Sequence, residues 1–304
     1  MLDFARRVAI ITGAGQGLGR AYALMLAARN AAVVVNDVNR ASAEAVVEEI
    51  RASGGQAVAD THDVGRSAAG VVKTAVDTFG HLDVVICNAG ILRAGRFADQ
   101  PEDEFWRVFD VSFRGVVDLS RKAWPHLAKS AAGRLILTSS SGVLANPGAA
   151  AYGAAKAAIW GLGNSLAAEG ADDGIQVTTI LPTAYTPMSE DAYSDPAIVA
   201  TLREKMGPEH VAAFVAFLAH QDTTVGGDVF QVGGLHAGRI VLAGLPRSGV
   251  ATGTPEMWAT MQDELTADSD DLEQYRTTGD HSAPAITANN PALAPIFASM
   301  AANS

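Results

Sequence analysis

The ten residues ITGAGQGLGR, numbers 11–20, decide the class of fold that this chain adopts. Four glycines stand there between a β-branched run and a helical pattern: Gly13, Gly15, Gly17 and Gly19. Without Cβ atoms, such a turn lets the backbone approach a phosphate closely, and the N–H groups and dipole of a helix that begins near Leu18 favour its negative charge. The stretch, Gln16 included, therefore predicts a strand, a pyrophosphate-binding turn and a helix.

Strand-like and helix-like patterns alternate along the rest of the chain. Apolar, β-branched runs occupy residues 6–12, 31–37, 56–60, 82–90, 134–140, 175–182 and 228–234. Helical patterns lie between them at residues 17–30, 40–54, 67–80, 102–129, 150–171 and 211–220. Most runs are apolar throughout, as expected of strands whose two faces are both covered by helices. We therefore predict an α/β protein with a doubly wound parallel sheet, a Rossmann fold, in one domain spanning residues 1–242.

Two segments fall outside this pattern. Residues 183–208 are rich in proline and lack periodicity, so we expect a mobile flap. Residues 243–304 form an extension in which TPEMWATMQDEL, numbers 254–265, predicts a helix with Thr254 as its cap and Pro255 in its first turn. A disordered tail is the alternative. Apolar side chains favour an extension packed on the domain, partly irregular: Trp258, Met261, Leu265, Tyr275 and Phe297.

Composition narrows the class of protein. The net charge is -11 and basic clusters are few, which argues against a nucleic acid partner. Cys87 is the only cysteine, so we expect neither a disulfide framework nor a metal site, and a reducing compartment such as the cytoplasm fits. The N-terminal sequence runs almost directly into a strand, and no apolar run approaches the length of a membrane span, about 20 residues. We therefore expect a cytoplasmic protein without a signal peptide or a membrane partner.

An acidic residue follows the second predicted strand. Asp37 lies eighteen residues after Gly19, where a carboxylate can bond both hydroxyls of a ribose. The same charge repels a 2'-phosphate, and neither Gln16 nor Asn36 offers a compensating cation, so the pattern favours NAD over NADP. The alternative is a solvated turn residue at the end of the strand.

A tyrosine and a lysine four residues apart supply a candidate proton-transfer pair. In YGAAK, numbers 152–156, helical spacing places Lys156 on the same face as Tyr152. A phenol, whose pKa is ordinarily about 10, needs a nearby cation to serve as a base at neutral pH. Ser139 ends a predicted strand thirteen residues earlier and can hydrogen-bond a substrate oxygen. Taken alone, such a Tyr/Lys pair would be interpreted as an ordinary surface pair. Together with the glycine turn and Ser139, it is better interpreted as a catalytic pair.

Four motifs together resemble the short-chain dehydrogenase/reductase family: TGAGQGLG at 12–19, CNAG at 87–90, Ser139, and YGAAK at 152–156. The resemblance covers residues 5–236. It implies hydride transfer between a nicotinamide and a carbonyl/secondary-alcohol pair, with Tyr152 exchanging the proton and Lys156 also holding the nicotinamide ribose. It further implies cofactor contacts at Asp63, Val64, Asn88, Ala89, Gly90, Pro182, Tyr185 and Thr186.

The chain departs from that family at VSFRG, residues 111–115. The family usually has an asparagine where Ser112 stands, which kinks the helix and holds a water of the proton relay. A serine hydroxyl can bond water but offers fewer donors and acceptors than an amide. Ser112 is thus a candidate relay residue. Because the usual asparagine is absent, the alternative to an active dehydrogenase is an inactive nucleotide-binding interaction protein.

A second departure points to a subgroup. LPTAYTPM at 181–188 and GGDVFQVGGLHAGRI at 226–240 resemble the (3R)-hydroxyacyl-CoA dehydrogenase domain of peroxisomal multifunctional enzymes type 2 and their bacterial single-domain relatives. The resemblance implies oxidation of a 3-hydroxyacyl-CoA to the 3-ketoacyl-CoA in lipid or steroid side-chain degradation, with Arg93, Arg96 and Arg239 as candidate contacts for the CoA phosphates. A free secondary alcohol, a steroid or a terpenol, is the rival substrate. The resemblance to the family also implies a homodimer or homotetramer, in which the helices at 102–129 and 150–171 pair across the interface.

Overall fold

The computed structural model describes residues 2–144, 146–187, 195–244, 255–267 and 272–275. The chain divides into two compact units, Met1–Arg239 and Ile240–Ser304. The first unit contains the predicted nucleotide-binding domain. The boundary expected at residue 242, and the packing of the extension on the domain, stay predictions.

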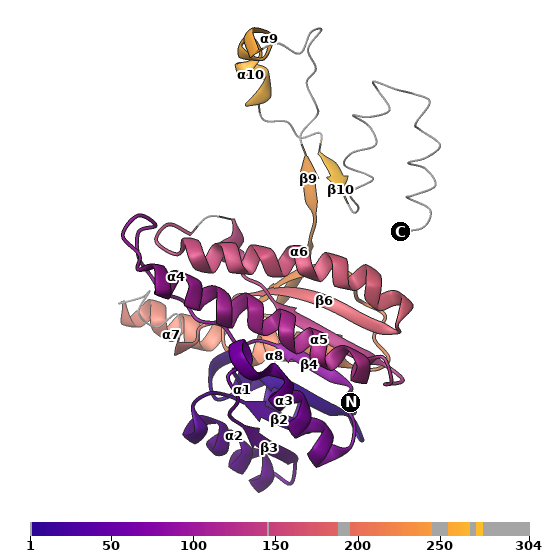
Figure 1. Cartoon of the computed structure of the whole chain (residues 1–304). Coiled ribbons are helices and arrows are strands. Elements are labelled where there is room, and N and C mark those ends of the chain that lie inside the picture. Colours follow the sequence, from indigo (N-terminus) through magenta and orange to yellow (C-terminus); the bar gives the residue numbers. More distant parts are fainter. Residues whose placement is uncertain (1, 145, 188–194, 245–254, 268–271, 276–304) are drawn as a thin grey trace. The chain divides into compact units, whose positions relative to one another are not determined.

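The first unit is built on a central, eight-stranded sheet (Figure 1). Its strands are β1 (Val8–Thr12), β2 (Ala32–Asn36), β3 (Gln56–Asp60), β4 (Val84–Cys87), β5 (Gly133–Thr138), β6 (Ile175–Pro182), β7 (Val229–Gly233) and β8 (His236–Ile240). They lie in the order β3-β2-β1-β4-β5-β6-β7-β8, and β1 to β7 pair in parallel. The strand order reverses between β1 and β4, and a ligand cleft forms at such a switch point, outside the carboxyl ends of the strands.

Helices cover both faces of this sheet (Figure 1). One layer holds α1 (Gly17–Ala27), α2 (Arg40–Ala52) and α8 (Pro208–Ala219). The other holds α3 (Val64–Phe79), α5 (Gly115–Leu127) and α6 (Ala150–Asp172). Within β2, Val33 and Val35 pack in the first layer and Val34 in the second, all fully buried. Burial on both sides explains the continuous apolar runs, and the doubly wound prediction is confirmed.

The long helix predicted at residues 102–129 is interrupted. α4 (Glu102–Phe109) continues through a π-helical turn, η1 (Asp110–Arg114), into α5. The two glycines at this crossing allow close packing against the start of α3: a Cβ built on Gly65 would lie 2.7 Å from the Asp110 carbonyl oxygen, and one on Gly115 would lie 2.9 Å from a methyl of Val64. The single apolar period of the sequence could not reveal the extra residue in the turn.

Part of the expected flap is helical. α7 (Pro196–Lys205) is capped by Asp195, whose carboxylate accepts from the N–H groups of Ala197 and Ile198. No residue of α7 is buried, which explains why its sequence shows no clear apolar period. Residues 188–194 of the predicted flap lie outside the described residues.

The described part of the second unit contains short elements. β9 (Leu242–Gly244) pairs antiparallel with β10 (Glu273–Tyr275), and the helix predicted at 254–265 is found as α9 (Pro255–Ala259) and α10 (Gln262–Leu265). Pro255 opens α9 as expected, while the proposed cap Thr254 and the apolar Phe297 lie outside the described residues.

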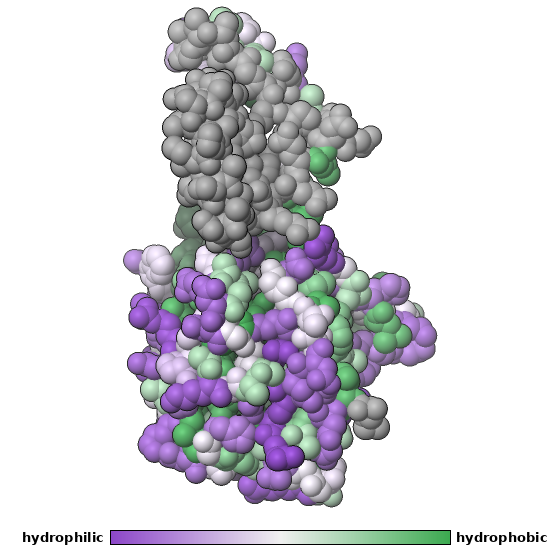
Figure 2. All heavy atoms as spheres, turned by 90° about the vertical axis from the view of Figure 1, so that its right-hand side faces the viewer, coloured by the Kyte–Doolittle hydropathy of each residue, from purple (hydrophilic) through white to green (hydrophobic). Residues whose placement is uncertain are grey.

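One face of the described surface is mostly polar. On the face that Figure 2 shows, hydrophilic residues predominate over the described surface and apolar residues are scattered between them. None of the helices in the described part of the chain is long and apolar enough to span a membrane.

Candidate active site

A cavity of about 430 Å³ lies where the switch point of the sheet predicts a ligand. Most of the residues that the sequence singled out line it: Gly13, Gln16, Gly17, Leu18, Asp37, Asp63, Val64, Asn88, Ala89, Gly90, Ser139, Tyr152, Lys156, Pro182 and Thr186. Sequence reasoning missed ten further lining residues: Asn36, Val38, His62, Ile91, Arg107, Val111, Thr138, Ser140, Ala184 and Pro187. Most of these are immediate neighbours of predicted residues, which is the only signal that the sequence offers for them.

The glycine turn has the geometry of a phosphate cradle. Gly13 and Gly17 have φ of +61° and +54°, a backbone region that favours glycine. A Cβ on Gly19 would lie 2.1 Å from the carbonyl oxygen of Gly13, so only glycine lets α1 begin this close to β1. Gly15 and Gly19 do not line the cavity and instead shape the turn.

The carboxylate of Asp37 is fixed at the edge of this turn. One oxygen accepts from the backbone N–H of Gly15 at 2.9 Å, and the other accepts from the N–H of Asn39 at 2.9 Å. A carboxylate has about four lone-pair sites, so two bonds leave acceptors for a pair of ribose hydroxyls. The free acceptors therefore fit the hydroxyl groups of the adenosine ribose of a dinucleotide.

Asn88 holds the glycine turn against β4. Its side-chain amide donates to the carbonyl oxygens of Thr12 at 2.9 Å and Gly13 at 3.2 Å. The Thr12 hydroxyl accepts in return from the backbone N–H groups of Asn88 and Ala89, each at 3.0 Å. Asn88 thus lines the cavity and at the same time fixes the two loops that face a bound nucleotide.

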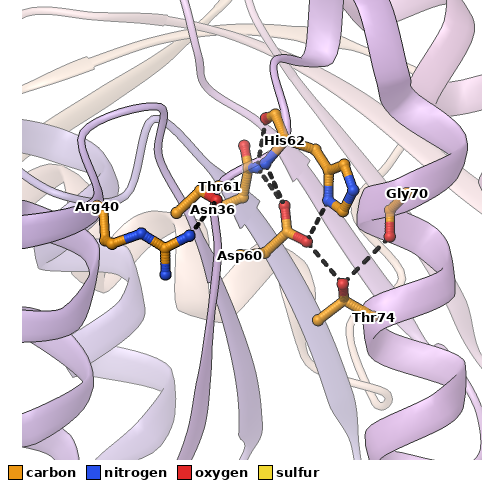
Figure 3. A network of polar contacts seen from close by, with 7 residues as sticks. All are labelled: Asn36, Arg40, Asp60, Thr61, His62, Gly70 and Thr74. Carbon is orange, nitrogen blue, oxygen red and sulfur yellow. Dashed lines mark hydrogen bonds and ion pairs between the residues drawn. The ribbon is translucent and has the colours of Figure 1, made fainter.

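A polar network supports the far end of the cavity (Figure 3). The buried carboxylate of Asp60 accepts from the Asn36 amide at 2.6 Å and the Thr74 hydroxyl at 2.6 Å, and it contacts His62 Nδ1 at 2.8 Å. Burial by itself raises the pKa of Asp60, but its hydrogen bonds to Thr74, His62 and Asn36 outweigh burial and leave the pKa below its usual value. The network ties the loop after β3 to β2 and α3.

That loop carries Asp63 and Val64 at the start of α3. The Asp63 carboxylate caps the helix through the N–H of Gly65 at 2.9 Å and pairs with Arg107 of α4 at 2.8 Å. Burial raises the pKa of Asp63, while the hydrogen bonds from Arg107 and Gly65 bring the net pKa below its usual value. Asp63 therefore stays ionised beside the cavity.

Tyr152 and Lys156 stand in the first turns of α6, at the other end of the cavity. Lys156 is 3% exposed, and its Nζ donates to the carbonyl oxygen of Thr138 at 2.7 Å and lies 5.7 Å from the centre of the Tyr152 ring. Burial lowers the pKa of Lys156 to about 8. Burial also raises the pKa of Tyr152, and a side-chain hydrogen bond with Ser140 offsets part of that rise. In this structure the phenol is therefore protonated at neutral pH.

The serines after β5 take different positions. Ser139 is 1% exposed, and its hydroxyl donates to the carbonyl oxygen of Lys156 at 2.8 Å. Ser140 precedes the short 3₁₀ turn η2 (Ser141–Val143), and its Oγ accepts from the N–H of Gly142 at 3.0 Å. The contact of Ser139 with a substrate oxygen thus stays a prediction, since its hydroxyl turns toward α6 here.

Two further candidates lie behind the cavity wall. Ser112 is fully buried in η1, and its hydroxyl accepts from the backbone N–H of Ile91 at 3.2 Å. A Cβ built on Gly90 would lie 3.4 Å from Ser112 Oγ and 3.3 Å from Lys156 Nζ, so both side chains approach the same glycine. Tyr185 is 9% exposed and does not line the cavity, and its ring packs under Arg203.

A sequence model of the family described as short chain dehydrogenase matches residues 7–197. The chain belongs to the short-chain dehydrogenase family. This dehydrogenase is 42% identical over 242 residues to peroxisomal multifunctional enzyme A of Dictyostelium discoideum, across 76% of the chain and 54% of the relative. The solved structure of full-length peroxisomal multifunctional enzyme type 2 from Drosophila melanogaster matches with a TM-score of 0.80 and 30% identity, across 94% of the chain and 50% of that structure. The dehydrogenase thus spans about half the length of these relatives.

A second similar solved structure holds a cofactor. It is a 7α-hydroxysteroid dehydrogenase complexed with NADH and 7-oxo glycochenodeoxycholic acid, with a TM-score of 0.69 and 28% identity, across 76% of the chain and 94% of that structure. The dehydrogenase described here is an oxidoreductase that uses a nicotinamide cofactor and acts on small-molecule substrates.

Proposed function

We propose that the enzyme oxidises 3-hydroxyacyl-CoA to 3-ketoacyl-CoA with NAD. The observation that carries the proposal is that Tyr152 and Lys156 line the same cavity as the glycine turn and Asp37. Such an arrangement brings the proton-transfer group to the end of a dinucleotide cleft.

The residues divide the work along the cavity. The glycine turn and the start of α1 bind the pyrophosphate, and Asp37 binds the adenosine ribose. Bound NAD supplies the hydride acceptor. Tyr152, as phenolate, takes the proton of the substrate hydroxyl during oxidation and, as phenol, returns it during reduction, while Lys156 holds positive charge beside it. Ser139 orients the reacting oxygen once its hydroxyl leaves the Lys156 carbonyl.

The proposed substrate is inferred from similarity to other enzymes and not from an observed CoA-binding site. The enzyme resembles the multifunctional peroxisomal enzymes in sequence and in fold. Of the arginines suggested for the CoA phosphates, Arg93 donates to the carbonyl oxygen of Leu92 and Arg239 pairs with Asp228 at 3.6 Å. Their convergence on one phosphate site stays a prediction.

A free steroid alcohol is the second candidate substrate. The similarity to a hydroxysteroid dehydrogenase favours it, as do two large apolar side chains exposed on the loops beside the cavity, Phe97 and Leu144. The deciding experiment is a screen for NADH formation with 3-hydroxyacyl-CoAs of several chain lengths, the matching free alcohols and hydroxysteroids. Turnover of the thioesters alone supports the proposal, and turnover of free alcohols alone contradicts it.

We further propose a cytoplasmic homodimer or homotetramer that uses α6. Small residues form the exposed face of this helix, which would let a second helix approach closely: Ala150, Ala154, Ala157, Gly161 and Asn164. The single, buried cysteine is compatible with a reducing compartment. Cell fractionation tests the location.

A further inference from the structure

Ser140, rather than its predicted neighbour Ser139, contacts the phenol of Tyr152. Ser140 lines the cavity, and the two side chains share a hydrogen bond. They meet over Gly142, because a Cβ built there would lie 3.3 Å from Ser140 Oγ and 3.4 Å from Tyr152 Cε1. The end of β5 therefore presents a second hydroxyl to the group that exchanges the proton.

The surroundings of Ser140 leave its hydroxyl proton available for that hydrogen bond. Its Oγ already accepts from the N–H of Gly142 at 3.0 Å, so its own O–H remains available as a donor. A donor aimed at the phenolic oxygen stabilises the phenolate more than the phenol. The Ser139 hydroxyl and the Lys156 ammonium, by contrast, both donate to backbone carbonyl oxygens.

We propose that Ser140 is a positioning residue of the reaction, whose hydroxyl holds the Tyr152 oxygen in line and donates to it while it carries negative charge. The inference rests on the proposed function, in which the hydroxyl proton of the alcohol passes to the Tyr152 phenolate. The hydride passes to the nicotinamide in the same step, so the alcohol becomes a ketone. Ser140 itself gains and loses no proton.

Charged groups around the cavity do not duplicate this effect. Lys156 is the cation on the same helix, and it keeps its charge near the ring in every variant considered below. The other charged lining residues, Asp37, Asp63 and Arg107, stand with His62 at the nucleotide end. Removal of the Ser140 hydroxyl leaves these charges in place and, apart from freeing the N–H of Gly142, is expected to act on Tyr152.

The test compares Ser140→Ala with Ser140→Thr, which keeps a hydroxyl, and with Ser141→Ala, which alters the exposed neighbouring serine. We expect Ser140→Ala to lower kcat for alcohol oxidation about 10- to 100-fold, with KM and NADH affinity little changed. The rising limb of the pH–rate profile for oxidation should move to higher pH. Ser140→Thr should restore most of the activity, and Ser141→Ala should behave as the parent.

A substrate-free measurement separates this inference from the proposed function. Phenolate absorbance is titrated for each protein and for its Tyr152→Phe partner, and the difference gives the pKa of Tyr152 without cofactor or substrate. We expect this pKa to rise in Ser140→Ala and to return in Ser140→Thr. An unchanged Tyr152 titration in a folded Ser140→Ala protein overturns the inference, even if kcat falls. If Ser140→Ala does not fold, Ser140→Cys, a weaker donor of similar size, must show the same rise or the inference is wrong. A parent enzyme that oxidises no alcohol counts against the proposed function, and the titration still decides the role of Ser140.

Discussion

At the scale of single residues, the site balances burial against hydrogen bonding. Tyr152 and Lys156 are both pushed toward their neutral forms by burial, the phenol to a raised pKa and the ammonium to a pKa of about 8. At neutral pH the phenol is therefore protonated, while most Lys156 side chains keep their charge, and that charge together with the positive charge of an oxidised nicotinamide would favour the phenolate.

Tyr152→Phe should abolish turnover while the cofactor still binds. The change removes only the hydroxyl, and it leaves untouched the glycine turn and Asp37, which are expected to contact the nucleotide. NADH fluorescence should report unchanged affinity, while steady-state kinetics should show a loss of more than about 1000-fold. Activity within tenfold of the parent would remove Tyr152 from the mechanism.

The pKa of Tyr152 predicts opposite pH trends for the two directions. Oxidation requires the phenolate, and burial raises the pKa of the phenol, so the oxidation rate should climb as pH rises from neutral. Reduction requires the phenol and should decline over the same range. Initial rates in both directions at constant ionic strength test this, and an oxidation rate that falls above neutral pH, in a protein still folded there, contradicts it.

Asp37 is expected to choose between the two nicotinamide cofactors. Its fixed carboxylate repels a 2'-phosphate, and Val38 beside it is exposed with space for a longer side chain. Asp37→Ser combined with Val38→Arg should move the ratio of kcat/KM from NAD toward NADP by at least about tenfold. A parent enzyme that already prefers NADP would show that the reading of this strand end is wrong.

At the scale of elements, the π turn η1 places Ser112 against the loop after β4. The asparagine usual in the family kinks the helix at this position, and with Ser112 in its place the helix is still widened into a π turn. The hydroxyl of Ser112 also satisfies the partly buried N–H of Ile91, which ties η1 to the cavity wall.

Ser112→Ala should therefore destabilise the fold instead of stabilising it. Loss of the partner of this partly buried N–H costs up to about 3 kcal/mol, whereas the better helix propensity of alanine returns less than about 1 kcal/mol. If Ser112 also holds a relay water, kcat should fall about 10- to 100-fold with NADH affinity unchanged. Chemical denaturation and kinetics across pH measure the two effects separately, with Ser120→Ala, a buried serine of α5, as the matched control. Unchanged turnover would exclude Ser112 from the proton relay.

At the scale of the whole molecule, the exposed face of α6 predicts how copies assemble. Ala157→Arg places a long charged side chain where a second helix is expected to approach, so the oligomer should dissociate. Light scattering after size exclusion measures the mass, and Glu48→Arg on the exposed face of α2 is the control. A mass that stays oligomeric in Ala157→Arg would place the interface elsewhere.

The sequence alone determined the architecture and the position of the cavity, because both depend on residue types and spacings that are local in the chain. The seven strands from β1 to β7 were all predicted, because burial on both faces requires continuous apolar runs. The glycine turn and Asp37 could be identified as candidate dinucleotide-binding residues from the sequence. Such binding depends on glycine backbone geometry and on a carboxylate at a fixed spacing along the chain.

Only the tertiary structure decided the orientation of individual groups and the course of the irregular segments. The sequence placed Ser139 at the site, but packing of β5 against α6 turns its hydroxyl to the Lys156 carbonyl and leaves Ser140 beside Tyr152. The π turn η1 likewise depends on contacts with α3, a segment distant in sequence. Spacing along the chain fixes which residues share a face, whereas the direction of a hydroxyl is set by partners that only the folded chain brings within hydrogen-bonding distance.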